Sequence, residues 1–172
     1  MRGRRTVRSR CRRHLDGITI PQPFSLDVLC AQVAVSRQRP LHLRPLPQPT
    51  DPGLPTGLWL NGETADYVFY DGRTSELHKR HIVLHEIGHM LFGHDDKGLD
   101  DNDVLFRGPQ DPLRADLIRR IHARRRYSSA QEREAEMMAT MFLEAIGSLP
   151  PPSPLAGFAG RIAGAVGYTG RR

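Results

Sequence analysis

The chain has 172 residues, of which 38% are hydrophobic and 26% are charged, and its formal net charge is +6. This length supports one domain with its own core and is short for two, and the composition excludes disordered and fibrous proteins. The longest weakly polar stretch, residues 155–168, is shorter than the ~20 residues that a membrane-spanning helix needs. We therefore expect one soluble domain without a membrane span.

The cysteines and the N-terminus bear on the compartment. Cys11 and Cys30 are the only cysteines, and they do not form a Cys-x-x-Cys pair. This usage favours a reducing compartment and argues against cysteine as a metal ligand. No apolar run of ~7 to 15 residues follows the basic N-terminus, so a secretory signal is not predicted. The expected location is the cytoplasm.

Arginines gather in two places: seven within residues 1–13 and five within residues 119–126. The first cluster has no interleaved aromatic side chains, and the second lies on an expected helix, where arginines commonly form a solvated face. We therefore do not expect direct nucleic-acid binding. Residues 1–20 are interpreted as a basic, disordered tail and residues 149–172 as a Pro/Gly-rich tail, which leaves residues 21–148 as the folded domain.

One helix and three strands are predicted in the first half of this domain. Residues 24–39 carry apolar side chains at helical spacing and end before Pro40, which predicts a helix. Residues 41–46 alternate apolar with polar side chains ahead of a proline-rich stretch and predict a short edge strand. Residues 57–60 and 65–70 flank Asn61-Gly62, a pair typical of tight hairpin turns. We expect a small antiparallel sheet.

The most informative segment reads His85-Glu86-Ile87-Gly88-His89. It lies in an apolar stretch, residues 75–92, which we predict to be a helix with Thr74 or Ser75 as its N-cap. Residues i and i+4 share a helix face, so the two histidines can bind one ion while Glu86 points at its open side.

This arrangement is typical of hydrolytic zinc centres. Zinc takes neutral imidazole ligands and keeps one position for water, whose pKa falls to about 7 on binding. The motif therefore predicts one Zn²⁺ per chain, with His85 and His89 as ligands and Glu86 as the catalytic base. The competing interpretation is that the histidines are polar members of an amphipathic helix and that Glu86 is solvated.

A third zinc ligand is required, and the sequence offers two kinds. His94 follows Gly93, where the motif helix is expected to end, and this place favours a capping role at the helix C-terminus. A second helix, predicted over residues 128–146, presents Glu132 and Glu136 on one face among small residues. Glu132 also completes a capping-box pattern with Ser129, and Glu136 could be an acid beside the ligands or at the surface. The residues alone leave this choice open.

The two segments together resemble a known family. The stretch from His85 to His94, followed by Glu132-Arg133-Glu134-Ala135-Glu136-Met137-Met138-Ala139, is similar to the ImmA/IrrE family of metallopeptidases. In that family, a His-Glu-x-x-His helix is followed by a helix reading approximately Glu-x-Glu-Ala-Asn-x-Phe-Ala. The resemblance covers roughly residues 24–146. It implies a gluzincin-like site in which Glu132 is the third ligand and Glu136 occupies the asparagine position.

The expected fold is therefore a single α+β, zincin-like domain, with the small antiparallel sheet packed against the motif helix and a second, ligand-bearing helix. The resemblance implies a zinc metallo-endopeptidase that cleaves a helix-turn-helix transcriptional repressor encoded nearby. The alternative is a catalytically silent regulatory or toxin–antitoxin-type component that binds a partner through the same fold. We expect the substrate to pair, as an extended peptide, with a free edge of the strand at residues 65–70.

Overall fold

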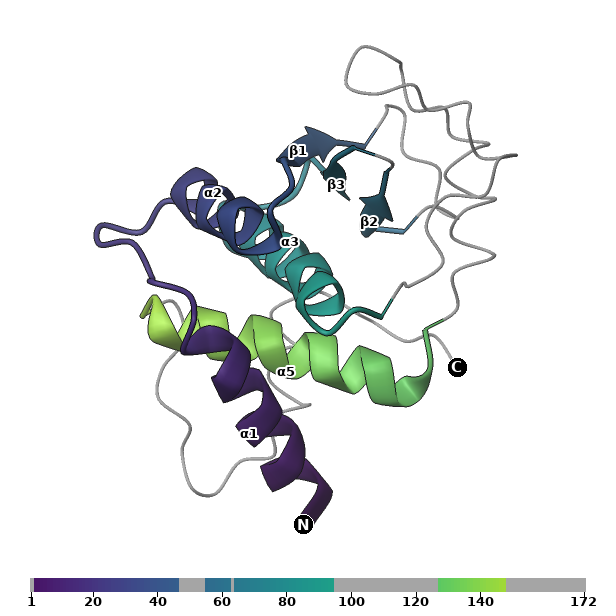
Figure 1. The fold of residues 1–172 in the computed structure, drawn as a ribbon. Helices are drawn as coiled ribbons and strands as arrows, with labels where there is room; N and C mark the ends of the chain where they lie inside the picture. Colours follow the sequence, from purple (N-terminus) through teal and green to yellow (C-terminus); the bar gives the residue numbers. More distant parts are fainter. Residues whose placement is uncertain (1, 47–54, 63, 95–126, 148–172) are drawn as a thin grey trace.

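The computed structural model describes residues 2–46, 55–62, 64–94 and 127–147, and these form an α+β fold (Figure 1). The expected class is thus confirmed. The elements run in the order α1 (Arg2–Leu15), α2 (Leu26–Arg37), β1 (Leu41–Pro45), β2 (Gly57–Asn61), β3 (Asp66–Tyr70), α3 (Glu76–Leu91) and α5 (Ser129–Ala145).

The three-stranded sheet is mixed, and the expectation of an antiparallel sheet is wrong. Strands β2 and β3 form the expected antiparallel hairpin, with Gly57 opposite Tyr70. Strand β1, however, lies on the other side of β3 and runs parallel to it, with Leu41 opposite Asp66. Alternating side chains identify a strand but not the direction of its partner, which depends on how the whole chain folds. Because β3 is central, the free edge expected at residues 65–70 does not exist, and the edge strands are β1 and β2.

Helix α3 lies between the sheet and α5. Its side chains Ile82, Val83, Leu84, Ile87 and Met90 are buried, so the helix has apolar contacts on several sides. Figure 1 shows α5 crossing α3 on the side away from the sheet. The core thus forms around the helix that carries the histidine motif, which fixes that motif in place.

Two glycines, Gly88 and Gly57, allow neighbouring elements to lie close together around α3. A Cβ atom on Gly88 would lie 2.9 Å from the Cα atom of Ala135 in α5, and one on Gly57 would lie 2.6 Å from Ile82 Cγ2. Side chains larger than hydrogen do not fit at such separations. Gly88 therefore permits the approach of α5, and Gly57 permits that of β2.

The N-terminal residues differ from the disordered tail that the sequence predicted. Helix α1 packs beside α5 (Figure 1), and Arg8 and Arg10 form ion pairs with acidic residues of α5. Cys11 is fully buried, and Val7 and Leu15 pack against the same core. Their spacing of four residues is that of one helix face. The density of arginines hides this narrow apolar stripe in the sequence.

None of the helices in the described part of the chain is both long and apolar enough to cross a membrane. The second arginine cluster, residues 119–126, and the expected C-terminal tail, residues 149–172, lie outside the described residues.

Candidate metal centre

Helix α3 brings the two motif histidines together. It begins at Ser75, one of the two expected caps, whose Oγ accepts a hydrogen bond from the backbone N–H of His78 at 3.2 Å. In the last two turns of the helix, the Nε2 atoms of His85 and His89 lie 3.0 Å apart. His89 is buried, with 1% of its surface exposed, and His85 is half-buried. Two imidazoles therefore converge on one point, as the i, i+4 spacing predicted.

Helix α5 adds Glu132. Its capping box joins Ser128 and Gln131, so the box expected between Ser129 and Glu132 is shifted by one residue. The Glu132 side chain is therefore not needed at the helix end and reaches α3. Its Oε2 atom lies 3.3 Å from His85 Nε2 and 3.8 Å from His89 Nε2.

These three atoms have the spacing of metal ligands. They form a triangle with edges of 3.0, 3.3 and 3.8 Å. Ligand atoms bound ~2.0–2.1 Å from a tetrahedral zinc ion stand roughly 3.3 Å apart. The triangle therefore fits one face of a zinc tetrahedron. All three residues line a cavity of about 410 Å³, which provides space for a water molecule and a substrate group.

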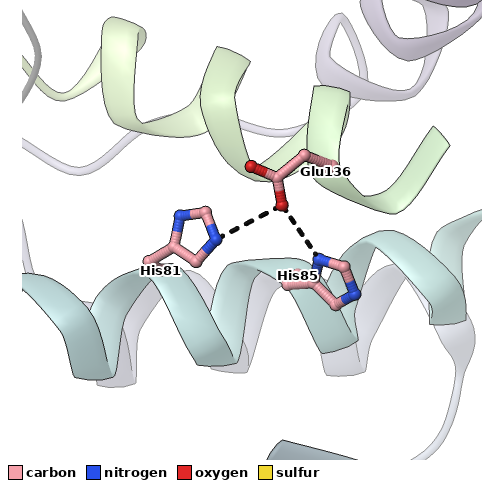
Figure 2. Close-up of side chains that lie close together, drawn as sticks. All are labelled: His81, His85 and Glu136. Atoms are coloured by element: carbon pink, nitrogen blue, oxygen red, sulfur yellow. Dashed lines mark ion pairs between the residues drawn. The ribbon is translucent and has the colours of Figure 1, made fainter. Parts of the chain in front are cut away.

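Glu136 lies on the other side of His85. Its Oε2 atom is 3.4 Å from His85 Nδ1 and 3.3 Å from His81 Nε2 (Figure 2). His81, His85 and Glu136 are thus a second group that could hold a metal, and it shares His85 with the first. A histidine that binds a metal through one nitrogen usually donates its other N–H to a carboxylate or carbonyl. The arrangement suits Glu132 as a ligand and Glu136 as the acceptor from His85 Nδ1.

Glu86 is buried rather than solvated, with 8% of its surface exposed, so the competing interpretation of a solvated side chain is wrong. Its Oε2 atom accepts a hydrogen bond from the backbone N–H of Trp59 in β2 at 2.9 Å. The Trp59 indole in turn donates to Asp66 Oδ1 at 3.0 Å, which anchors this strand. A Cβ on Gly57 would come within 2.8 Å of Glu86 Oε1. Strand β2 therefore fixes the carboxylate at the wall of the cavity.

The charges of the site are strongly coupled. Burial alone would lower the pKa of His85, but hydrogen bonds to Glu132 and Glu136 and the charge of Glu86 raise it to about 10. The hydrogen bond from His85 holds the pKa of Glu132 far below its usual range. Burial would raise the pKa of Glu136, but His81 and His85 lower it to about 2. In the absence of a metal, a cationic His85 therefore lies between two carboxylates. A bound metal ion would replace one proton of His85 as the positive charge beside Glu132.

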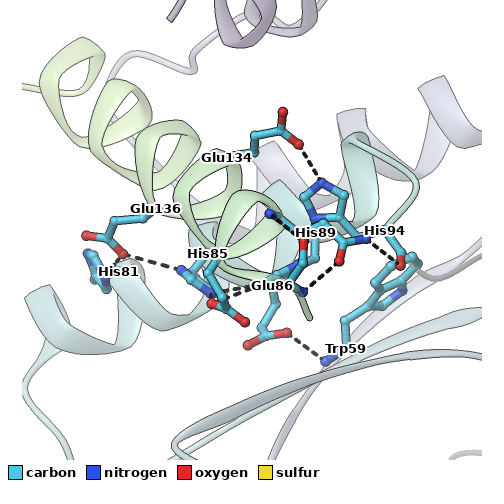
Figure 3. A network of polar contacts seen from close by, with 11 residues as sticks. Trp59, His81, His85, Glu86, His89, His94, Glu134 and Glu136 are labelled. Atoms are coloured by element: carbon cyan, nitrogen blue, oxygen red, sulfur yellow. Dashed lines mark hydrogen bonds and ion pairs between the residues drawn. The ribbon is translucent and has the colours of Figure 1, made fainter. Parts of the chain in front are cut away.

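His94 does more than end the helix. Its backbone N–H donates to the carbonyl oxygen of His89 at 3.0 Å, which agrees with the expected capping role. Gly93, with φ of 64°, then turns the chain back, so that the imidazole of His94 reaches His89 and Glu134 (Figure 3). The sequence pattern assigned no role to Glu134, because the turn of the chain at Gly93 cannot be read from helical spacing.

Tyr127 and His78 also line the cavity, and the sequence pattern singled out neither. The Tyr127 ring stacks on His89, with centroids 3.7 Å apart and planes at 17°. His78 Nδ1 lies 2.6 Å from Thr74 Oγ1, within hydrogen-bonding distance. Tyr127 precedes the cap of α5, and only its position directly before the second helix could have indicated that it lies near the ligands.

Comparisons with protein-family models, with curated proteins and with solved structures found no match to this chain. A functional proposal for this chain therefore rests on its own paired motifs and on the arrangement of their side chains around one cavity.

Proposed function

We propose that the protein is a zinc metallopeptidase with a zincin-like fold, in which His85, His89 and Glu132 hold the metal and Glu86 is the general base. The observation that carries this proposal is the convergence of one Nε2 atom from each histidine and one oxygen of Glu132 within 3.8 Å of one another, at the wall of an open cavity. Structural zinc sites are closed by four protein ligands, whereas catalytic sites have three and keep a position for water. Within the described residues, three ligands face the cavity, and this number matches a catalytic site.

The chemistry divides between the metal and the chain. Bound zinc supplies an acidified water molecule and polarises the scissile carbonyl. Glu86 keeps one oxygen on the Trp59 N–H, and this contact fixes the carboxylate so that the other oxygen can accept a proton from the water and deliver it to the leaving amine. Tyr127, stacked on His89, covers that ligand from one side.

The edge strand β2 is the proposed substrate-binding strand, in place of the central strand β3. Thr56, Gly57 and Leu58 line the same cavity as the ligand residues, and β2 lies at the edge of the sheet. An extended peptide that pairs with this edge would pass beside the metal. Such pairing selects unfolded or linker segments. In line with the motif resemblance, the proposed substrate is the exposed linker of a helix-turn-helix repressor encoded nearby.

The test compares zinc-loaded wild-type protein with Glu86→Gln, incubated with that repressor, and maps the products by mass spectrometry. We expect the variant to keep zinc and fold but to lose at least the ~10² to 10⁴ in rate that a general base contributes. Equal turnover by the variant would rule out the role of Glu86. Stable binding of the repressor without cleavage, at confirmed zinc occupancy, would favour the silent regulatory component instead.

A further inference from the structure

A chain of polar contacts leads from the candidate ligand His89 to the N-terminal helix. His89 Nδ1 lies 2.9 Å from His94 Nδ1, and His94 Nε2 lies 3.0 Å from Glu134 Oε2. Glu134 Oε1 accepts a hydrogen bond from Arg10 Nη1 in α1. Figure 3 shows Glu134 reaching His94 from α5, away from the side on which Glu136 meets His81 and His85. The contacts thus connect α3, α5 and α1.

The donors and acceptors of this chain follow one from another. The Glu134 carboxylate can only accept hydrogen bonds, so His94 carries a proton on Nε2. A His89 that binds a metal through Nε2, the nitrogen that faces His85 and Glu132, carries its own proton on Nδ1. It can donate this proton to His94 Nδ1, which accepts because the His94 proton lies on Nε2. A metal requires this tautomer of His89.

The surroundings hold His94 in this orientation. Its side chain is 5% exposed and that of Glu134 is 11% exposed. The His94 ring stacks on Phe92, with planes at 13°. The Arg10 guanidinium lies over the Phe92 ring, 5.1 Å from its centroid. His14 of α1 meets Phe92 edge-on. Helix α1 therefore contacts the end of α3 both through Glu134 and through Phe92.

We propose that Glu134 and His94 are positioning residues for His89 and that α1, through Arg10, helps to set the affinity of the metal centre. The inference rests on the proposed function in taking His89 as a ligand. Loss of the contact chain leaves all three ligands in place but allows His89 to adopt the other tautomer or to rotate. The arginine-rich N-terminus would then be part of the metal site's support rather than a tail.

Glu134→Gln tests this directly because it reverses one hydrogen bond while preserving size. Arg10 needs an acceptor, so the glutamine oxygen faces Arg10 and the amide NH₂ faces His94 Nε2, which must then accept. His94 would donate from Nδ1 and place the His89 proton on Nε2, where the metal should bind. We expect zinc affinity, measured by chelator competition, to fall ~10 to 100-fold, and the visible spectrum of the Co²⁺-substituted protein to change.

Glu144→Gln is the matched control, because the ion pair of Glu144 with Arg8, at 2.8 Å, also joins α5 to α1 but involves none of the histidines. It should leave zinc affinity and the Co²⁺ spectrum at wild-type values. If Glu134→Gln does not fold, His94→Phe keeps the stacking on Phe92 while removing both ring nitrogens, and the same loss is expected.

The outcomes separate this inference from the proposed function. Wild-type affinity and spectrum in Glu134→Gln would overturn the inference alone, as would an equal loss in Glu134→Gln and Glu144→Gln, which would indicate a general effect of helix docking. Failure of the wild-type protein to bind zinc would overturn the proposed function and the inference with it.

Discussion

The two nitrogens of His85 face different carboxylates, and this separates residues that the sequence left as alternatives. Glu132 approaches the nitrogen shared with His89, whereas Glu136 approaches the opposite nitrogen together with His81. One neutral imidazole cannot bind a metal through both nitrogens, so only one of the two groups can use His85 as a ligand. The group containing Glu132 includes both motif histidines and is therefore the proposed centre.

The raised pKa of His85 predicts the pH dependence of metal binding. The pKa of His85 in the metal-free fold is about 10, above its ordinary value of 6.5, so at pH 8 the metal must displace a proton. Zinc binding should release about one proton there, and its apparent affinity should rise up to about tenfold per pH unit between pH ~7 and ~9. Calorimetry in two buffers with different ionisation enthalpies measures the released proton. Binding at pH 8 without proton release would contradict a cationic His85.

The same shifts determine how the metal-free protein responds to pH. Because the folded pKa of His85 is raised, its contribution to stability is full below pH 6.5 and is lost as the pH rises towards 10. The pKa of Glu136 is lowered from 4.5 to about 2, so its contribution is full above pH 4.5 and is lost as the pH falls towards 2. Both groups therefore contribute their full stability to the metal-free fold between pH 4.5 and pH 6.5.

At the scale of elements, local patterns predicted α3, α5 and the β2–β3 hairpin, because caps and periodicity act over a few residues. The hairpin connection is longer than a two-residue turn at Asn61-Gly62, since Asn61 belongs to β2 and pairs with Asp66. The parallel pairing of β1 and the docking of α1 depend on distant partners, and no local pattern contains them. The capping box moved by one residue because Ser128 and Ser129 are both suitable caps. Because of that shift, the side chain of Glu132 is not part of the capping box and reaches the histidines.

The close approach of α3 and α5 predicts the effect of a methyl group at their contact. In Gly88→Ala, the new Cβ would lie 2.9 Å from Ala135 Cα and 3.0 Å from its carbonyl oxygen, and backbone atoms cannot move aside as side chains can. Alanine favours an isolated helix by up to ~1 kcal/mol, but separating the two helices should cost more. We expect a net loss of about 1–2 kcal/mol and weaker zinc binding, because Glu132 retreats with α5.

Urea unfolding of the metal-free protein and chelator competition measure these two effects. Gly17→Ala is the control, since its Cβ would meet nothing nearer than 3.8 Å, and it should change neither quantity appreciably. Unchanged stability in Gly88→Ala would show that the helices are not held at this contact.

For the molecule as a whole, the sequence predicted the part of the site that lies within two helix faces. His85, Glu86 and His89 follow from one helical repeat. A second repeat placed both Glu132 and Glu136 on one face, and the family resemblance favoured Glu132. The contacts that hold these residues in place do not follow from helical spacing. The contacts of Glu134 with His94 and with Arg10 form only where three helices meet. Tertiary packing thus converts an arginine-rich terminus and an acid on the other face of α5 into neighbours of the proposed metal centre.

The central claim is that one zinc ion is bound by His85, His89 and Glu132, and zinc stoichiometry and affinity across a set of variants test it most directly. Wild-type protein should bind about one zinc per chain, Glu132→Ala should lose the site, and Glu136→Ala should weaken it by ~10 to 100-fold while still binding. His42→Ala, whose ring stacks on Tyr67 in the sheet, should retain wild-type affinity. Normal zinc binding by Glu132→Ala, with loss in Glu136→Ala, would contradict the account and transfer the metal to the group of His81, His85 and Glu136.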